Sequence, residues 1–456
     1  YYNEGHNLVD NTSAHWGYDF NHESTYTVNF FNDVLSFWMN EYKIDGFRFD
    51  FTKGLSNTIY NGADNWASAY DAARIQNLKA FADHVWANDP GNEPYVIFEH
   101  LGSDVEEQQW ANYRIDEGKG IMMWSEMWNS YKELANGTAS SFDRMGHVAH
   151  GFTQKRTLGY PESHDKDRIM YEMTTFGKTG TGYDIKDLNT ALARMSTLGA
   201  VTLTIPGPKM LWHFADLGMD DSIWLCSDGV TVNSDYDGIP GDCKLSTKPQ
   251  PQWSENWLGN PNRKQVYDDW SRIIQLKTQE AVFEGDYIIE SGTLTPKIYV
   301  FDDTLPSSGL KNVVILANFD VVAQNITPNF PYTGIWYDLM DETGSSSINV
   351  SNTSTAINLA AGAFKIYGNK ASTLSVSDIE KKLFAIYPNP TNTGFVTITS
   401  NNSDNIHAQV FDILGKQVLN NTISNNRLNV SSLNAGIYIV KLTQDNASVT
   451  KKLVIK

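Results

Sequence analysis

A short run from Asp45 to Asp50 places an arginine and a carboxylate among aromatic residues in the pattern of a β-strand. Side chains on a strand alternate between its two faces, so Arg48 and Asp50 share one face while Phe47 and Phe49 share the other. The aromatic face is suited to burial under helices. An inward-facing arginine and aspartate are costly unless they pair or do chemistry, and the carboxyl end of a parallel strand is a common place for catalytic groups. A structural ion pair is the alternative, and this strand alone favours neither.

Two more predicted strand ends carry carboxylates. Glu99 closes an apolar run that begins at Tyr95, and Glu162 and Asp165 follow a run that begins at Leu158. Cleavage of a glycosidic bond uses two carboxylates, one as acid and then base, the other as nucleophile. The strand ends therefore predict a carboxylate site suited to that chemistry.

Composition limits the kinds of partner. The 456 residues carry a formal net charge of −18, and a surface of that sign repels nucleic acid and anionic membranes. No run reaches the roughly 18 uninterrupted apolar residues of a membrane helix, so no membrane span is expected. Hydrophobic residues at 41% are sufficient for two to four packed domains. An acidic surface remains compatible with a neutral substrate.

From residue 23 to 283, strand-like runs alternate with helical patterns, which predicts an α/β fold with parallel strands. The expected strands are Ile44–Phe51, Tyr95–Leu101, Gly120–Trp124, Leu158–Glu162 and Val201–Ile205. A helix is expected over Tyr26–Tyr42, where the apolar residues that recur at helical spacing, expected to pack in the core, are Val28, Phe31, Leu35, Trp38 and Met39.

After residue 283 the pattern changes to short alternating runs such as Lys297–Phe301 and Val313–Ala317, typical of an all-β sandwich. Residues 369–380 have the composition of a linker. A second all-β module is expected over 381–456, with strands near Phe395–Thr399, His407–Phe411 and Ile437–Leu442.

Three segments, in their order along the chain, resemble conserved regions of the α-amylase family of glycoside hydrolases. They are Asp45 to Gly54, the strand that ends at Glu99, and Glu162 to Arg168. Two further segments resemble other regions of that family. One is Trp16 to Asn21, and the other is Pro206 to Met210 together with Leu217 and Gly218. The resemblance implies a partial TIM (β/α)8 barrel that lacks its first strands, followed by two all-β sandwich modules. The implied parts are a loop-domain remnant (1–22), barrel strands four to eight (23–283) and the family's sandwich (284–368).

Carried over position by position, the resemblance implies that Asp50 is the nucleophile, Glu99 the general acid and base, and Asp165 the carboxylate that holds substrate hydroxyls. It places Arg48 beside the nucleophile, where its charge favours an ionised carboxylate. His164 would donate to sugar hydroxyls. Glu99 must stay protonated, and an apolar pocket would achieve that.

The chain also departs from the family pattern. Lys53 matches a substrate contact, but Gly54 stands where the family commonly has a histidine whose carbonyl binds a structural calcium ion. A glycine carbonyl can do the same, so calcium stays a candidate and no organic cofactor is expected. The family's first conserved region is absent, so this chain is expected to be the C-terminal part of a longer protein.

One acidic loop could bind calcium by itself. Asp235 and Asp237 stand at alternate positions before Gly238, as at the start of a calcium loop, but Lys244 occupies the position where an acidic ligand is expected. Two cysteines flank this acidic turn, Cys226 and Cys243. A disulfide there would stabilise the fold by about 3 kcal/mol, with two unlinked thiols as the alternative.

Aromatic residues near the predicted site could stack on sugar rings, although most aromatic residues at such positions belong to the core. The candidates are Trp16, Tyr18, Trp124, Trp128 and Trp212. We expect only one or two of them to contact substrate, and assign Tyr18 and Trp212.

The C-terminal module resembles the type IX secretion sorting domain of certain Gram-negative bacteria. The residues that carry the resemblance are Ile386–Thr391, Val410–Lys416, Gly436–Tyr438 and Lys451–Lys456. It implies contact with the type IX secretion machinery and a secreted or cell-surface protein. A generic β-sandwich is the alternative.

Together the resemblances imply a secreted, retaining α-glucan hydrolase that cleaves α-1,4 bonds of starch or malto-oligosaccharides through a covalent intermediate. A glucan-branching enzyme or other transglycosylase would use the same carboxylates, although a secreted protein argues against branching. A non-catalytic glucan-binding protein is the remaining alternative, and the intact carboxylates argue against it.

Overall fold

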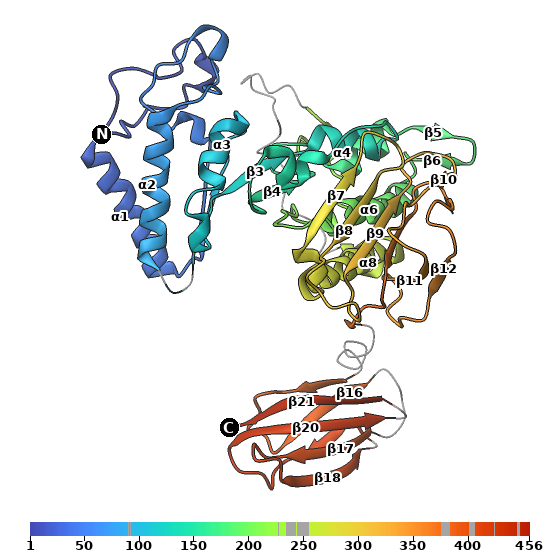
Figure 1. The fold of residues 1–456 in the computed structure, drawn as a ribbon. Coiled ribbons are helices and arrows are strands. Elements are labelled where there is room, and N and C mark those ends of the chain that lie inside the picture. Colours follow the sequence, from blue (N-terminus) through green and yellow to red (C-terminus); the bar gives the residue numbers. More distant parts are fainter. Residues whose placement is uncertain are drawn as a thin grey trace. The chain divides into compact units, whose positions relative to one another are not determined.

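The computed structural model describes residues 1–89, 91, 93–226, 228–233, 243, 255–374, 384–400, 406–423, 425–444 and 447–456. Asp235 and Asp237 therefore lie outside the described residues. The chain forms two compact units (Figure 1). The first contains Tyr1–Gly334 and Asn349–Asn369, and the second contains Ile335–Ile348 and Lys370–Lys456.

The first unit is built around a four-stranded parallel sheet in the order β1-β2-β3-β4. Its strands are β1 (Gly46–Phe49), β2 (Tyr95–Phe98), β3 (Met122–Glu126) and β4 (Thr157–Tyr160). The helices that precede, connect and follow them include α1 (Thr25–Tyr42), α2 (Ala72–Asn88), α3 (Asp104–Ala111), α4 (Trp128–Ala135), α5 (Ile169–Phe176), α6 (Leu188–Leu203) and α8 (Pro261–Gln279). Four of the five predicted strands are thus confirmed.

The prediction of a strand at Val201–Ile205 is wrong. Val201 to Leu203 form the last turn of helix α6, which is buried on every side along its second half. A short apolar run is compatible with a buried strand or a fully buried helix, and periodicity cannot separate the two. The next segment contributes only a bridge, in which Lys209 pairs in parallel with Gly159.

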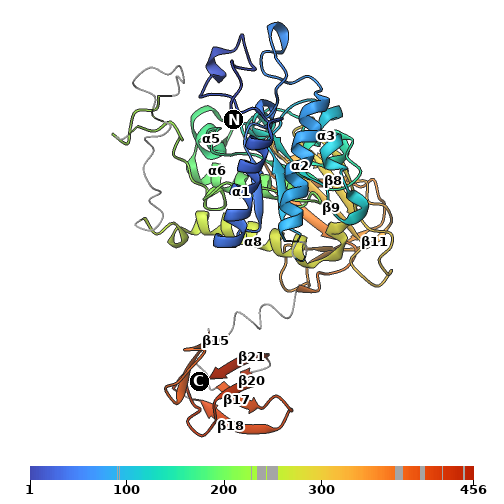
Figure 2. The same cartoon turned by 90° about the vertical axis from the view of Figure 1, so that its left-hand side faces the viewer.

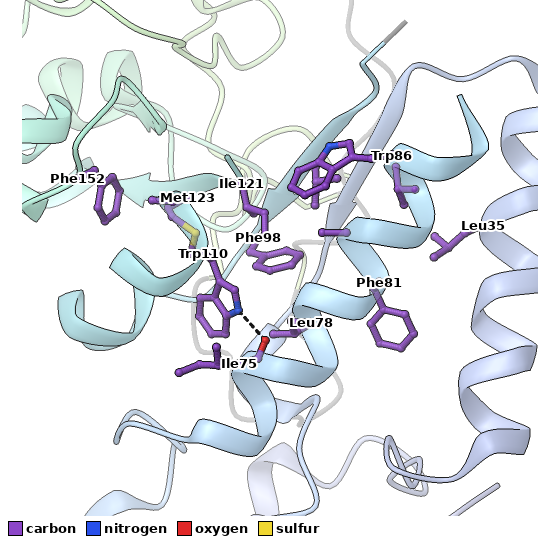
Figure 3. Packing of buried hydrophobic residues seen from close by; sticks show 14 of the residues in the cluster. Leu35, Ile75, Leu78, Phe81, Trp86, Phe98, Trp110, Ile121, Met123 and Phe152 are labelled. Carbon is purple, nitrogen blue, oxygen red and sulfur yellow. Dashed lines mark hydrogen bonds between the residues drawn. The ribbon is translucent and has the colours of Figure 1, made fainter. Parts of the chain in front are cut away.

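Aromatic and aliphatic residues fill the space between the sheet and helices α1 to α3 (Figure 3). Phe98 and Trp110 are fully buried, and the Trp110 Nε1 donates to the Ile75 carbonyl at 3.3 Å. Helix α1 confirms the prediction at Leu35 and Met39, which are buried, but Trp38 is 43% exposed. The aromatic face of β1 therefore packs under helices as its alternation predicted.

The strands after the helical region confirm an all-β segment. Within the first unit, β7 (Asp286–Glu290), β8 (Lys297–Phe301), β9 (Asn312–Ala317) and β14 (Phe364–Gly368) pair antiparallel in the order β14-β9-β8-β7. Two smaller ladders accompany them, formed by β5 (Thr179–Gly180) with β6 (Tyr183–Asp184), and by β10 (Gln324–Ile326) with β13 (Ile357–Leu359). Strand β9 is buried at every position.

Two sheets form a sandwich in the second unit, seen from another side in Figure 2. One contains β15 (Phe384–Tyr387), β16 (Phe395–Ser400) and β19 (Arg427–Asn429). The other contains β18 (Gln417–Ile423), β17 (Ile406–Phe411), β20 (Gly436–Gln444) and β21 (Ala447–Ile455). Their inward-facing residues share one core. The remaining strands among the described residues are β11 (Gly334–Asp338) and β12 (Ser347–Val350).

None of the helices in the described part of the chain is both long and apolar enough to cross a membrane.

Candidate active site

The carboxyl ends of neighbouring parallel strands bring charged residues to one edge of the sheet. The register pairs Arg48 with Ile97 and Ile97 with Met122, so Asp50, Glu99 and Trp124 stand at the same level two residues further along. Because these positions have the same parity, their side chains leave the sheet on one face. This is the face opposite the helix-covered aromatic side.

Arg48 bridges the two carboxylates assigned to bond cleavage. Its Nη1 donates to Asp50 Oδ1, and its Nη2 lies 3.1 Å from Glu99 Oε2. The contact with Glu99 is an ion pair without hydrogen-bond alignment, since Arg48 Nε and Nη2 have no hydrogen-bond partner among the described atoms. The Asp50 side chain is 74% exposed and that of Glu99 is 16% exposed. The predicted nucleophile therefore faces solvent while the predicted acid is largely covered.

The backbone after β1 is shaped to hold Glu99. Phe51 has a φ of 39°, in the left-handed region that side chains other than glycine seldom adopt, and its N–H donates to Glu99 Oε2 at 2.8 Å. The Thr52 N–H and hydroxyl both donate to the Glu99 carbonyl at 2.9 Å. Strained backbone of this kind persists where its surroundings enforce it, often at functional sites.

Burial raises the pKa of Glu99 above its ordinary value, and the negative charge of Asp50 adds to the increase. The hydrogen bond from the Phe51 N–H and the charge of Arg48 act in the opposite direction. A raised pKa is what a carboxyl group needs if it is to donate a proton near neutral pH.

The loop after β4 carries the third predicted carboxylate. His164 Nε2 lies 3.1 Å from Asp165 Oδ2, and the His164 ring is 5.8 Å from the Trp212 ring. Both His164 and Asp165 are about half exposed. The structure thus places three of the predicted residues, including Trp212, in one group.

A buried ion pair fixes this loop. Arg168 Nη1 lies 3.2 Å from Glu162 Oε1 and donates to the His213 carbonyl at 2.7 Å, while the Ile169 N–H donates to Glu162 Oε2. Glu162 and Arg168 are almost fully covered, so their role is to shape the loop that presents His164 and Asp165.

Aromatic rings connect the strands on the same face. The Arg48 guanidinium stacks over Trp124 at 4.5 Å, and the Trp124 ring meets the Tyr160 ring edge-on at 4.7 Å. Trp124 is therefore part of the wall of the site and not a fully exposed platform for a sugar ring.

Lys53 lies next to the nucleophile segment. Its Nζ donates to Ser68 Oγ at 3.1 Å, and its carbonyl accepts from the Arg74 Nη1 at 2.8 Å. Burial, followed by the charge of Arg74, lowers the pKa of Lys53. Arg74 is itself paired with Glu106 by two hydrogen bonds of 2.7 Å, both side chains being fully buried.

Tyr18 has a different setting from the other candidates. It is 83% exposed and lies 6.1 Å from the Tyr2 ring, whereas Trp16 packs edge-on against Phe51 at 5.3 Å. The Trp66 ring also meets the Phe51 ring edge-on, at 5.9 Å. The sequence pattern favoured Tyr18 over Trp16 as a substrate contact, and it carried no signal for Trp66, which stands in a loop without a motif.

Among the described residues, acidic and histidine side chains come together at one place with spacing suited to a metal ion. The cluster of acidic and histidine side chains with suitable spacing is Asp104, Glu107 and His150. The guanidinium of Arg144 already donates to both Asp104 oxygens at 2.9 and 2.6 Å and contacts His150 Nδ1 at 2.8 Å. A cation there would compete with this arginine. Gly54 is outside the cluster, and calcium stays a prediction.

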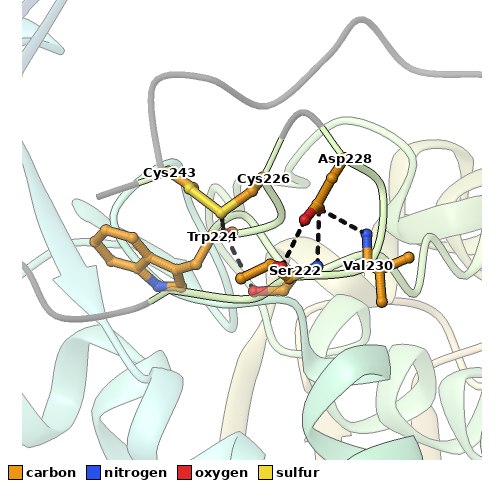
Figure 4. Close-up of a disulfide and its surroundings, with 7 residues drawn as sticks. Ser222, Trp224, Cys226, Asp228, Val230 and Cys243 are labelled. Atoms are coloured by element: carbon orange, nitrogen blue, oxygen red, sulfur yellow. Dashed lines mark hydrogen bonds between the residues drawn. A yellow bond between two sulfur atoms is a disulfide. The ribbon is translucent and has the colours of Figure 1, made fainter. Parts of the chain in front are cut away.

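Cys226 and Cys243 form a disulfide with a Cα–Cα distance of 4.9 Å (Figure 4). Next to it, Asp228 accepts from the Val230 and Thr231 N–H groups at 3.0 and 2.9 Å, which closes a tight turn.

Residues 385–456 match a family model described as a secretion system C-terminal sorting domain. This domain directs export by type IX secretion, to the cell surface or outside the cell. The match lies within the predicted module of residues 381–456. No curated protein matches the chain in sequence.

Solved structures resemble the chain in fold. The crystal structure of AmyP in complex with maltose has a TM-score of 0.54 at 13% identity, over 77% of this chain and 69% of that one. Pullulanase from Bacillus acidopullulyticus has a TM-score of 0.52 at 19% identity, over 77% and 41%. Pullulanase type I from Bacillus subtilis str. 168, complexed with maltose, has a TM-score of 0.53 at 13% identity, over 80% and 49%. The chain spans less than half the length of either pullulanase.

At these identities the likeness is one of fold alone. The chain therefore shares the fold of α-amylase and pullulanase family enzymes and carries a secretion sorting domain.

Proposed function

We propose that the protein is a secreted, retaining α-glucan hydrolase of α-amylase type that cleaves α-1,4 bonds, and that β1 to β4 are part of a TIM barrel. The observation that carries the proposal is the pair of carboxylates, Asp50 and Glu99, joined by Arg48 at the ends of adjacent parallel strands. Exposed Asp50 suits a nucleophile and covered Glu99 suits an acid, which is the division of roles that glycoside hydrolysis requires.

In the first step an Asp50 oxygen attacks the anomeric carbon as the bond to the leaving oxygen breaks, and Glu99 gives that oxygen its proton. A glycosyl ester on Asp50 results. In the second step Glu99 takes a proton from water, whose oxygen attacks the anomeric carbon and releases Asp50. Asp165 and His164 hold sugar hydroxyls in this scheme, and Arg48 keeps both carboxylates aligned.

The test is starch hydrolysis by the full-length protein carrying Asp50→Asn. Loss of the nucleophile should reduce reducing-end release by at least about 10⁴-fold, whereas Asp45→Asn, an exposed change at the other end of the same strand, should have no effect. Undiminished activity in Asp50→Asn would overturn the proposal. Altered iodine staining with few new reducing ends would instead identify a transglycosylase.

A further inference from the structure

A fourth strand end carries a carboxylate to which the sequence patterns assigned no role. Glu126 is the last residue of β3, on the same face as Trp124 and two residues beyond the level of Glu99. Two residues of strand advance by about 6.6 Å, so Glu126 stands nearer the carboxyl edge of the sheet than the catalytic pair. Its Oε1 lies 3.5 Å from Lys166 Nζ, and Lys166 directly follows Asp165.

This pair differs from the structural ion pairs of the same unit. Glu106–Arg74 and Glu162–Arg168 are almost completely covered and held by further hydrogen bonds to backbone groups. In contrast, Glu126 is 21% exposed and Lys166 is 33% exposed, at a longer separation. A partly open carboxylate and ammonium can exchange their mutual contact for hydroxyl groups of a ligand.

Two aromatic residues lie near the pair. Lys166 Nζ lies 5.7 Å from the Trp128 ring, and the register pairs Glu126 with Tyr160. Tyr160 is on β4, the strand next to β3, and its ring meets the Trp124 ring edge-on at 4.7 Å. A few polar groups set among aromatic rings are typical of sites that bind small polar ligands such as sugars.

The order of the strands indicates which sugar this pair meets. Asp50 on β1 attacks the anomeric carbon, and Glu99 at the end of neighbouring β2 protonates the oxygen of the leaving sugar. Glu126 comes next, on β3, on the side of Glu99 away from Asp50. Building on the proposed function, we propose that Glu126 and Lys166 bind hydroxyl groups of the departing glucosyl unit, which is also the position of an acceptor sugar.

The test compares two substrates in the full-length protein. When maltopentaose is cleaved, the leaving group is a sugar. When 4-nitrophenyl α-maltoside is cleaved, the leaving group is nitrophenol, which has no sugar hydroxyls and whose release can be followed directly. Glu126→Gln and Lys166→Met should each lower kcat/KM for maltopentaose about tenfold, because each loses a hydrogen bond from a charged group. Both variants should keep nitrophenol release within about twofold of the parent protein.

Controls separate this role from a structural one. If the two residues act as one pair, the double variant should lose no more kcat/KM for maltopentaose than the more impaired single variant. Glu172→Gln, at another half-buried carboxylate beside a lysine, should cleave both substrates normally. Unchanged or equally reduced cleavage of both substrates by Glu126→Gln and Lys166→Met would overturn the inference. A parent protein that cleaves neither substrate would overturn the proposed function, and this inference with it.

Discussion

The Arg48 guanidinium lies 3.1 Å from Glu99 Oε2 while it donates a hydrogen bond to Asp50, so one side chain on β1 fixes residues on two strands. The guanidinium is also stacked over Trp124 on a third strand. A planar group with several donors can make all of these contacts at once, which an ammonium group cannot.

Arg48→Lys should therefore lower kcat/KM for maltopentaose by about 10²-fold, because the ammonium group cannot bridge both carboxylates and stack on the ring. Steady-state kinetics with the parent protein alongside provide the measurement. Thermal unfolding should show that the variant is folded. A variant as active as the parent would show that the bridge is dispensable.

The pH profile should report the covered carboxyl group. Because burial raises the pKa of Glu99 above 4.5, the protonated acid persists to higher pH, and kcat/KM should fall only as pH rises through the raised pKa. Glu99→Gln should abolish this basic limb together with most of the activity. A basic limb that survives in the residual activity of Glu99→Gln would assign it to another group.

Arg74 and Glu106 should be important for stability, because removing one member of a fully buried pair leaves the other charge uncompensated. Glu106→Gln or Arg74→Met should lower the free energy of unfolding by about 3–5 kcal/mol, as measured by urea denaturation. Arg114→Met, at an exposed pair with Asp83, is the control and should change little. Equal effects in both places would contradict the structure.

The buried Lys277 should make the free energy of unfolding depend on pH. Burial, together with the charge of Lys155 and against the charge of Glu284, lowers the pKa of Lys277 to about 8. The unfolded chain, with a lysine pKa of about 10.4, binds more protons between these values, so stability should rise from pH 8 to 10.

Lys277→Met should remove this rise and stabilise the fold by a few kcal/mol at pH 7, measured as the difference from the parent protein across the pH range. Lys264→Met, at an exposed position of the same helix, is the matched control. A parent and Lys277→Met variant with parallel stability curves would contradict the burial of Lys277.

The sequence predicted the strand ends because alternation and terminal charges are local properties. Arg48, Asp50 and Glu99 met as expected. The segment at Val201–Ile205 could not be assigned, because an apolar run buried on all sides has no periodic signal. Glu126 was missed because its partner Lys166 lies far along the chain. Trp66 was missed because its contact with Phe51 depends on a loop whose path only tertiary structure defines.

The most direct test of the account is to trap the glycosyl ester on Asp50. Fluoride departs without an acid, so maltosyl fluoride should glycosylate the Glu99→Gln variant, which then lacks the base needed for hydrolysis. We predict that mass spectrometry of the quenched, digested protein will find a maltosyl adduct on the peptide containing Asp50. An adduct on another residue, or none while fluoride is released, would contradict the assignment of Asp50 as the nucleophile.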